Sequence, residues 1–187
     1  MKSVILASKS PRRLELLKML GYDVKAIVSE VDESVIYDAD NRNLVKKLSY
    51  EKAMAVFKLI NDDSTPIIAA DTIVDLNGAV LGKPKDRKEA KNMLTSLSDA
   101  THYVHTGITI LYNGKCISEC NTSSVTFRNI SDQELEEYLD TNDYADKAGS
   151  YGIQGKAGAF VERIDGDFFS IMGLPICAVS RILNDLN

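Results

Sequence analysis

The sequence predicts a single α/β domain over residues 1–187, built on a mixed β-sheet. Short apolar runs typical of buried strands alternate with segments of helical periodicity, as at 4–7 and 11–20. Asn-Gly pairs at 77–78 and 113–114 predict β-hairpins. Because hairpins join antiparallel strands and helical crossovers join parallel ones, we expect both pairings in one sheet.

The amino-terminal part is expected to open with a strand, a loop and a helix. Val4–Ala7 reads as a buried strand, Ser10 suits a helix N-cap, and Pro11 suits the first helical position. Gly21 is a natural stop for that helix. The elements expected next are a strand at 24–28, an acidic loop at 29–34, a helix at 41–60, a strand at 66–70, and hairpin strands at 73–76 and 79–81.

Two capping boxes predict helices in the remaining chain. Asp86 with Glu89, and Ser131 with Glu134, match the pattern in which the cap and the third helical residue satisfy each other. The other expected elements are strands at 102–111 and 116–127, a glycine-rich loop at 149–158, a hairpin turned at Asp165-Gly166, and a helix at 175–186.

Composition excludes several function classes. The net charge of −5 argues against binding to duplex nucleic acid, and 44% apolar residues argue against disorder. The three cysteines, at 116, 120 and 177, follow neither a disulfide nor a zinc pattern, which favours a reducing cytoplasm. No apolar stretch approaches the roughly 20 residues of a membrane span, and the opening apolar run is too short for a secretory signal.

A helix N-terminus rich in donors is the first candidate site. The hydroxyls of Ser8 and Ser10 and the guanidinium groups of Arg12 and Arg13 gather where a helix presents unpaired N–H groups. This combination suits phosphate oxygens. The same residues also suit a capped surface helix with two solvated arginines, and these residues alone leave both interpretations open.

Acidic residues form the second and third candidates. Asp71 and Thr72 follow the buried run 66–70, and ligands commonly bind at the ends of such strands. A carboxylate there can hold a hard metal ion or take a proton from water. Glu33, in the acidic loop, could supply a second metal-binding oxygen. The alternatives are a turn aspartate and a solvated loop.

Lys83 and the glycine-rich loop are the remaining candidates. Lys83 follows the hairpin return, which can bring an ammonium near Asp71. Gln154 offers both an amide donor and an acceptor, as reading a nucleobase edge requires. A surface lysine and a flexible loop are the alternatives. His102 and His105, three apart on a strand, face opposite sides, so we expect structural or surface roles rather than joint metal binding.

These segments together resemble the Maf family along essentially the whole chain. The shared motifs are Ser8-x-Ser10-Pro11-Arg12-Arg13, Lys52-Ala53, Ala70-Asp71-Thr72, Gly82-Lys83-Pro84, the run Asp146-Lys147-Ala148-Gly149-x-Tyr151-Gly152-Ile153-Gln154-Gly155, Ile164-Asp165-Gly166-Asp167 and Met172-Gly173-Leu174-Pro175. The resemblance implies a Maf-like (inosine triphosphatase-like) fold, with an elongated mixed sheet flanked by helices and two lobes around a central cleft. It also implies hydrolysis of nucleoside triphosphates to the monophosphate and pyrophosphate.

The resemblance also implies roles for the charged residues. Asp71 would bind Mg²⁺ or Mn²⁺ or act as general base, and Glu33 would help to hold the metal. Arg13, Lys52 and Lys83 would offset the charge that develops on the phosphates, Lys83 as part of the catalytic machinery.

Substrate choice is the last expectation from the resemblance. Arg12, Thr72 and Gln154 match the Maf group that acts on dTTP and UTP, and Ser8 would bind phosphate. A link to septum formation is implied, and a homodimer is compatible with the family. The rival functions are a nucleotide-binding regulator of septation with little catalysis, an ITP/XTP pyrophosphatase of the inosine triphosphatase type, and a general phosphatase.

Overall fold

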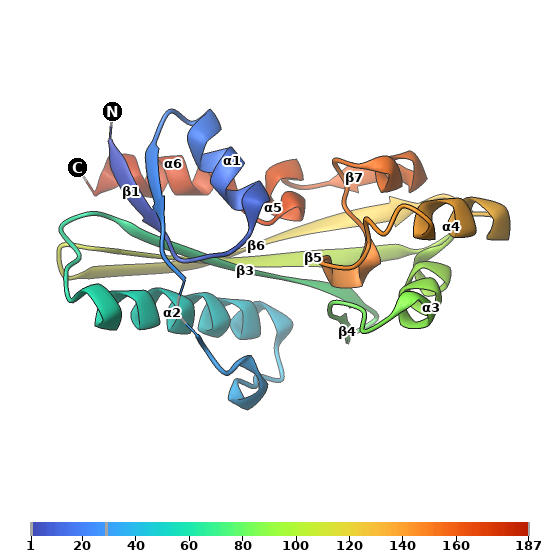
Figure 1. Cartoon of the computed structure of the whole chain (residues 1–187), viewed down its shortest axis with the longest axis horizontal. Helices are drawn as coiled ribbons and strands as arrows, with labels where there is room; N and C mark the ends of the chain where they lie inside the picture. The colour runs from blue at the N-terminus through green and yellow to red at the C-terminus, as the bar shows by residue number, and fades with distance from the viewer. Residues whose placement is uncertain (1, 29, 187) are drawn as a thin grey trace. The chain divides into compact units, whose positions relative to one another are not determined.

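The structure, a computed structural model, describes residues 2–28 and 30–186 and has a mixed α/β architecture (Figure 1). Over these residues a seven-stranded sheet has the order β2-β1-β3-β5-β6-β7, with β4 paired to β3. The strands are β1 Ser3–Leu6, β2 Asp23–Ala26, β3 Ile67–Leu76, β4 Ala79–Leu81, β5 Thr101–Tyr112, β6 Lys115–Phe127 and β7 Val161–Asp165. β1 pairs parallel with β2 and β3, whereas β3–β4 and β6–β7 are antiparallel. The predicted mixed sheet is therefore confirmed.

The α-helices are α1 Pro11–Met19, α2 Asn41–Ile60, α3 Arg87–Leu97, α4 Asp132–Leu139, α5 Phe168–Met172 and α6 Ile176–Asp185. Helices α1 to α4 lie between strands along the chain, and α5 and α6 follow β7. Short 3₁₀ turns are η1 Glu33–Val35, η2 Ala148–Ser150 and η3 Lys156–Phe160. Within the described residues, no helix combines the length and the apolar character that a bilayer crossing requires.

The chain forms two compact units. The first unit comprises Met1–Asp71, Thr106–Asn121 and Gly173–Asn187, and the second comprises Thr72–His105 and Thr122–Met172. Strands β3, β5 and β6 each continue from one unit into the other.

The core of the first unit lies between α2 and its strands. Ala53 and Val56 of α2 pack with Ile67 and Ala69 of β3 in a fully buried cluster. Gly107 of β5 lets the helix approach closely, since a Cβ there would lie 2.2 Å from the carbonyl oxygen of Val45. Real Cβ atoms essentially never come this near, so this contact requires glycine.

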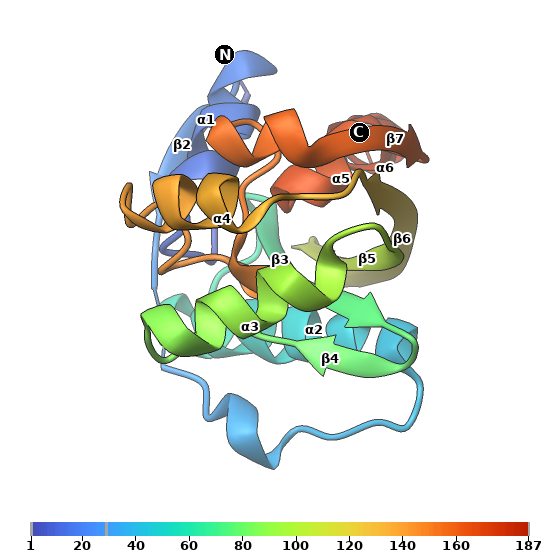
Figure 2. The same ribbon diagram turned by 90° about the vertical axis from the view of Figure 1, so that its right-hand side faces the viewer.

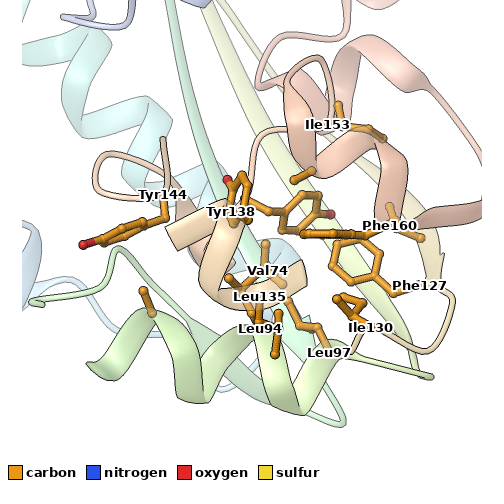
Figure 3. Packing of buried hydrophobic residues seen from close by; sticks show 14 of the residues in the cluster. Val74, Leu94, Leu97, Phe127, Ile130, Leu135, Tyr138, Tyr144, Ile153 and Phe160 are labelled. Atoms are coloured by element: carbon orange, nitrogen blue, oxygen red, sulfur yellow. The ribbon is translucent and has the colours of Figure 1, made fainter. Parts of the chain in front are cut away.

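The core of the second unit combines aliphatic and aromatic side chains (Figure 3). Leu94 of α3, Phe127 of β6 and Leu135 of α4 are almost completely buried in it. Ring contacts join Tyr138 to Phe160 at 5.5 Å and Phe127 to Phe160 at 6.2 Å, both edge to face. Figure 2 shows the β3–β4 hairpin of this unit, whose register pairs 74 with 81 and 76 with 79.

Most turn and cap predictions are confirmed. Asn77 and Gly78 both have positive φ, as do Asn113 and Gly114, which is the backbone that two-residue hairpin turns require. The Ser10 side chain accepts from the N–H of Arg13, and Ser131 with Glu134 forms a full capping box.

Three sequence expectations were wrong. The Asp86 side chain does cap α3, but Glu89 accepts from the N–H of Lys85 instead of closing a box with Asp86. Asp165-Gly166 turns no hairpin, because β7 ends there and the short helix α5 follows. The two strands expected at 66–70 and 73–76 are one continuous strand, β3.

Candidate active site

A lysine bridging two carboxylates forms the centre of the candidate site in the first unit. The Nζ atom of Lys52 lies 2.9 Å from Oε1 of Glu33 and also donates to Oδ1 of Asp71. The side chains of Lys52 and Asp71 are only 18% and 12% exposed, whereas that of Glu33 is 54% exposed. The cluster thus has a largely buried inner part and an outer carboxylate that reaches solvent.

Strand and helix periodicity explain why these groups meet. Asp71 alternates along β3 with Ile67 and Ala69, so all three point to the face on which α2 packs. Lys52 precedes Ala53 on α2, one turn before the buried Val56. Lys52 thus lies at the edge of the apolar face of α2, and Asp71 continues the apolar face of β3. Because these two faces pack together, the two side chains meet and bond to each other.

Asp71 lies within a strand rather than beyond its end. We expected it directly after the run 66–70, but β3 continues to Leu76. The strand continues because residues 74–76 pair with β4, and Lys52 satisfies the Asp71 carboxylate within the strand. Thr72 follows on β3 and points to the opposite face from Asp71, because successive strand side chains alternate.

Arg13 adds a second cation to the first-unit site. Its Nε donates to the carbonyl oxygen of Gly173 at 2.8 Å, and its Nη1 donates to Oγ of Ser8 at 3.2 Å. Burial lowers the pKa of Arg13, and attraction to Asp71 raises it. The nearby Arg12 lowers this pKa further, whereas Glu33 raises it. An arginine remains protonated even so, and a fixed positive charge therefore faces the carboxylates.

Ser8 and the start of α1 complete a donor-rich corner. The Ser8 oxygen accepts from the N–H of Ser10 at 3.1 Å and from Arg13, so its hydroxyl hydrogen can donate to a phosphate oxygen. Ser10 caps α1, and the helix N-terminus contributes further N–H groups. The predicted phosphate-binding residues Ser8, Arg13 and Lys52 thus lie in one unit with Asp71 and Glu33.

The first-unit cluster suits a hard divalent ion that arrives with a nucleotide. Glu33 and Asp71 offer carboxylate oxygens, and Mg²⁺ typically takes one or two protein carboxylates together with water and substrate phosphates. The described residues contain no group of three or more His, Cys, Asp or Glu side chains able to hold a metal. The donor set therefore fits a nucleotide-bound metal better than a cage made by protein alone.

Lys83 and Gln154 belong to the second unit, and both are exposed. The carbonyl of Gly82, just before Lys83, accepts from the N–H of Gly149 at 3.1 Å. This bond ties the end of the β3–β4 hairpin to the start of the glycine-rich loop.

Lys147 is a buried residue to which the sequence analysis assigned no role. Its Nζ donates to Oδ1 of Asp143 at 2.9 Å and to Oδ1 of Asp146 at 2.7 Å. A Cβ on Gly152 would lie 2.6 Å from Cε of Lys147, so the loop folds directly over this side chain. Its position inside the Asp146–Gly155 motif was the available signal, but periodicity could not reveal that it points inward.

The two histidines have structural partners, as expected. His105 is buried on β5, with Nδ1 2.9 Å from Oγ1 of Thr122 and Nε2 3.3 Å from Oδ2 of Asp75. His102, also buried, has Nε2 2.8 Å from the hydroxyl of Tyr151. Within the described residues, Cys116, Cys120 and Cys177 form no disulfide.

Comparisons with known proteins agree with these motifs. A family model described as Maf-like protein matches residues 3–186. A Bacillus anthracis protein named dTTP/UTP pyrophosphatase is 42% identical over 187 residues, covering 100% of this chain and 97% of its own. A Thermosipho africanus protein of the same name is 46% identical over 182 residues, covering 97% and 92%.

A solved structure supports the fold. The HAM1 protein of Coxiella burnetii matches with a TM-score of 0.54 at 16% identity, covering 99% of this chain and 100% of that one. At this identity the likeness concerns the arrangement of strands and helices alone.

Proposed function

We propose that this chain, which belongs to the Maf-like protein family, hydrolyses dTTP and UTP to the monophosphate and pyrophosphate. Relatives that match almost the whole chain carry the name dTTP/UTP pyrophosphatase. The structural observation that carries the proposal is the bridge from Lys52 to Glu33 and Asp71, with Arg13 beside it. Such a mixture of fixed cations and carboxylates suits a polyphosphate that is attacked by water.

The proposed chemistry is attack of water on the α-phosphorus. Asp71 accepts a proton from the water while the water oxygen bonds to the α-phosphorus. The bond between the α-phosphorus and the oxygen that bridges it to the β-phosphorus breaks. The products are a nucleoside monophosphate and pyrophosphate, with one proton passed to solvent. Lys52 holds the Asp71 carboxylate in place, and Arg13 and Lys52 offset charge that builds up on the phosphates.

We propose Mg²⁺ or Mn²⁺ as the cofactor, held by Asp71 and Glu33. When bound, such an ion supplies positive charge to the leaving pyrophosphate. Ser8 and the N-terminus of α1 would donate hydrogen bonds to phosphate oxygens.

The remaining assignments extend the proposal to residues outside this cluster. Lys83 would offset phosphate charge, and Arg12, Thr72 and Gln154 would select thymine or uracil. Gln154 is exposed on the glycine-rich loop and carries both a donor and an acceptor for a base edge. We also propose that the protein works on the cytoplasmic nucleotide pool, as a monomer or homodimer, without nucleic-acid or membrane partners.

The first experiment identifies the product. Purified protein is incubated with Mg²⁺ or Mn²⁺ and each of dTTP, UTP, CTP, ITP and 7-methyl-GTP, and pyrophosphate is assayed separately from orthophosphate. Pyrophosphate released mainly from dTTP and UTP supports the reaction and the base assignment. Orthophosphate as the main product, or turnover of ITP in preference to dTTP and UTP, contradicts the proposal.

A matched pair of variants on α2 tests the site itself. Lys52→Met removes the bridging ammonium and is expected to lower kcat/KM for dTTP strongly. Lys58→Met, on the same helix but exposed, is expected to leave it within about twofold. Equal activities for the two variants would remove Lys52 from the reaction.

A role in cell division is a further proposal, drawn from the family. Overexpression of the wild type is expected to delay septum formation. The Asp71→Asn variant should bind nucleotide without hydrolysing it, so its overexpression separates the effect of catalysis from that of binding. Delay by both proteins would favour a binding role, and delay by neither would contradict the link.

A further inference from the structure

A buried contact links β5 to the glycine-rich loop in the second unit. The Nε2 of His102 lies 2.8 Å from the hydroxyl of Tyr151, which belongs to the loop that carries Gln154. His102 is 0% exposed and Tyr151 is 6% exposed. The two rings also meet edge to face, with centroids 5.4 Å apart, and each contacts Phe127, at 5.0 Å for His102 and 4.9 Å for Tyr151.

A histidine is a poor choice for this place on packing grounds alone. Its Nδ1 is buried and finds no hydrogen-bond partner among the described residues. A leucine or phenylalanine would fill the same aromatic cluster without burying an unsatisfied polar atom. What the histidine adds is the bond to Tyr151. Either His102 Nε2 or the tyrosine hydroxyl donates in this bond, according to the tautomer of the ring, and the bond itself exists in both tautomers.

The loop on either side of Tyr151 is fixed by other contacts. The N–H of Gly149 donates to Gly82, and the hydroxyl of Tyr138 donates to the carbonyl of Ser150 at 3.3 Å. Beyond Tyr151, Gly152 lies against Lys147. Tyr151 attaches the loop to β5 through a side-chain hydrogen bond.

We propose that His102 is a positioning residue for base selection, acting through Tyr151 to hold the loop that presents Gln154. This inference rests on the proposed function, in which Gln154 contacts the base. His102 touches no reacting atom, so its removal should change which base is accepted more than it changes the chemical step. Burial lowers the pKa of His102 to about 4, so the ring is neutral at physiological pH.

Base selectivity in matched variants tests the proposal. Tyr151→Phe removes the hydroxyl and keeps the ring, and His102→Leu removes the other partner. Each is expected to raise KM for UTP and to lower the UTP-over-CTP preference in kcat/KM by roughly fivefold to tenfold, the usual effect of losing one hydrogen bond, with kcat within about twofold. The double variant should lose no more than either single one, because both remove the same bond.

Rescue and a control separate positioning from mere stability. His102→Gln keeps an amide that can donate to or accept from the tyrosine hydroxyl and should retain most of the preference. His105→Gln, on the same strand but bonded to Thr122 and Asp75, should leave the preference unchanged. If His102→Leu and Tyr151→Phe keep the wild-type preference, or lose activity equally toward every base, the proposal is overturned.

Hydrogen exchange distinguishes this inference from the proposed function. Amides 151–155 are expected to exchange faster in His102→Leu than in the wild type, with no change in His105→Gln. Faster exchange in a protein without pyrophosphatase activity would refute the proposed function while the anchoring of the loop stands. Unchanged exchange would overturn the anchoring itself.

Discussion

Two lysines, Lys52 in the first unit and Lys147 in the second, each bridge two carboxylates, yet they are built differently. Lys52 joins Glu33 and Asp71, which come from a 3₁₀ turn and a strand, and the bond to Asp71 spans 19 residues. Lys147 joins Asp143 and Asp146, which are four residues and one residue away.

The surroundings of the two bridges differ as well. Arg13 faces the Lys52 cluster, and Glu33 extends from it towards solvent, so a charged ligand can exchange with these groups. The Lys147 side chain is covered by Gly152, and its ammonium also donates to the backbone carbonyl of Asp143. The same chemical motif therefore serves a candidate reaction in one unit and holds a loop in the other. Charge pairing alone does not indicate function.

The largest expected effect comes from removing one carboxylate of the Lys52 bridge. Asp71→Asn should lower kcat/KM for dTTP about 100- to 10,000-fold, the usual contribution of a general base. Asp143→Asn removes the corresponding carboxylate of the Lys147 bridge and should act mainly on stability. Steady-state kinetics and thermal unfolding of both variants give the comparison. Near-wild-type turnover by Asp71→Asn would remove the distinction between the two bridges.

A pH dependence distinguishes the second unit. Burial lowers the pKa of His102 from 6.5 to about 4. Between pH 4 and pH 6.5, this histidine is therefore protonated in the unfolded chain and neutral in the folded chain. Stability from this neutral histidine is complete above pH 6.5 and is lost as the pH falls towards 4, by about 3 kcal/mol in total. Urea unfolding at pH 7 and pH 4.5 measures it. His102→Gln should lose less stability over this interval, and an equal loss would contradict the assignment.

Removing the Lys147 ammonium should lower stability more than activity. Lys147→Met leaves the Oδ1 atoms of Asp143 and Asp146 without their cation. We expect the free energy of unfolding to fall by about 2 kcal/mol, which is less than for a fully buried pair because both carboxylates are partly exposed. Lys156→Met, exposed and nearby in sequence, is the control. Denaturant titrations of the two proteins decide the matter, and equal midpoints would show that the bridge is dispensable.

The helix caps give the smallest expected difference between the units. Ser131 of α4 takes part in a full capping box with Glu134, whereas Ser10 of α1 accepts a long bond of 3.5 Å. Ser131→Ala should therefore cost about 1 kcal/mol, and Ser10→Ala less. Urea unfolding of both variants compares the caps, and a larger loss for Ser10→Ala would indicate that this serine has tertiary partners beyond capping.

Local signals in the sequence predicted the hairpins at 77–78 and 113–114 and the cap residues Ser10, Asp86 and Ser131, because these depend on residues a few positions apart. Asn77-Gly78 and Asn113-Gly114 have the positive φ angles that their turns require. Where tertiary partners decide, prediction failed. Asp71 was expected to follow a strand, but β3 continues to Leu76 because it pairs with β4 there.

The candidate site was predictable as a set of residues but not as an arrangement. The family resemblance selected Ser8, Arg13, Glu33, Lys52 and Asp71, which the structure places together in the first unit. No periodicity in the sequence could indicate that one lysine joins both carboxylates. The carbonyl of Gly173, which holds Arg13, was equally hidden, since the two residues lie 160 positions apart.

The glycine of β5 that meets α2 extends the meaning of the motif match. A single methyl group at Gly107 would force the backbone of Val45 away, and Val45 lies on the same helix as Lys52. A related sequence could therefore keep every charged residue of the motifs and still, with alanine at this one position, be unable to seat its lysine between the carboxylates. Gly107 is buried and takes no part in the chemistry, yet its presence is thus a criterion for deciding which distant relatives retain a working site.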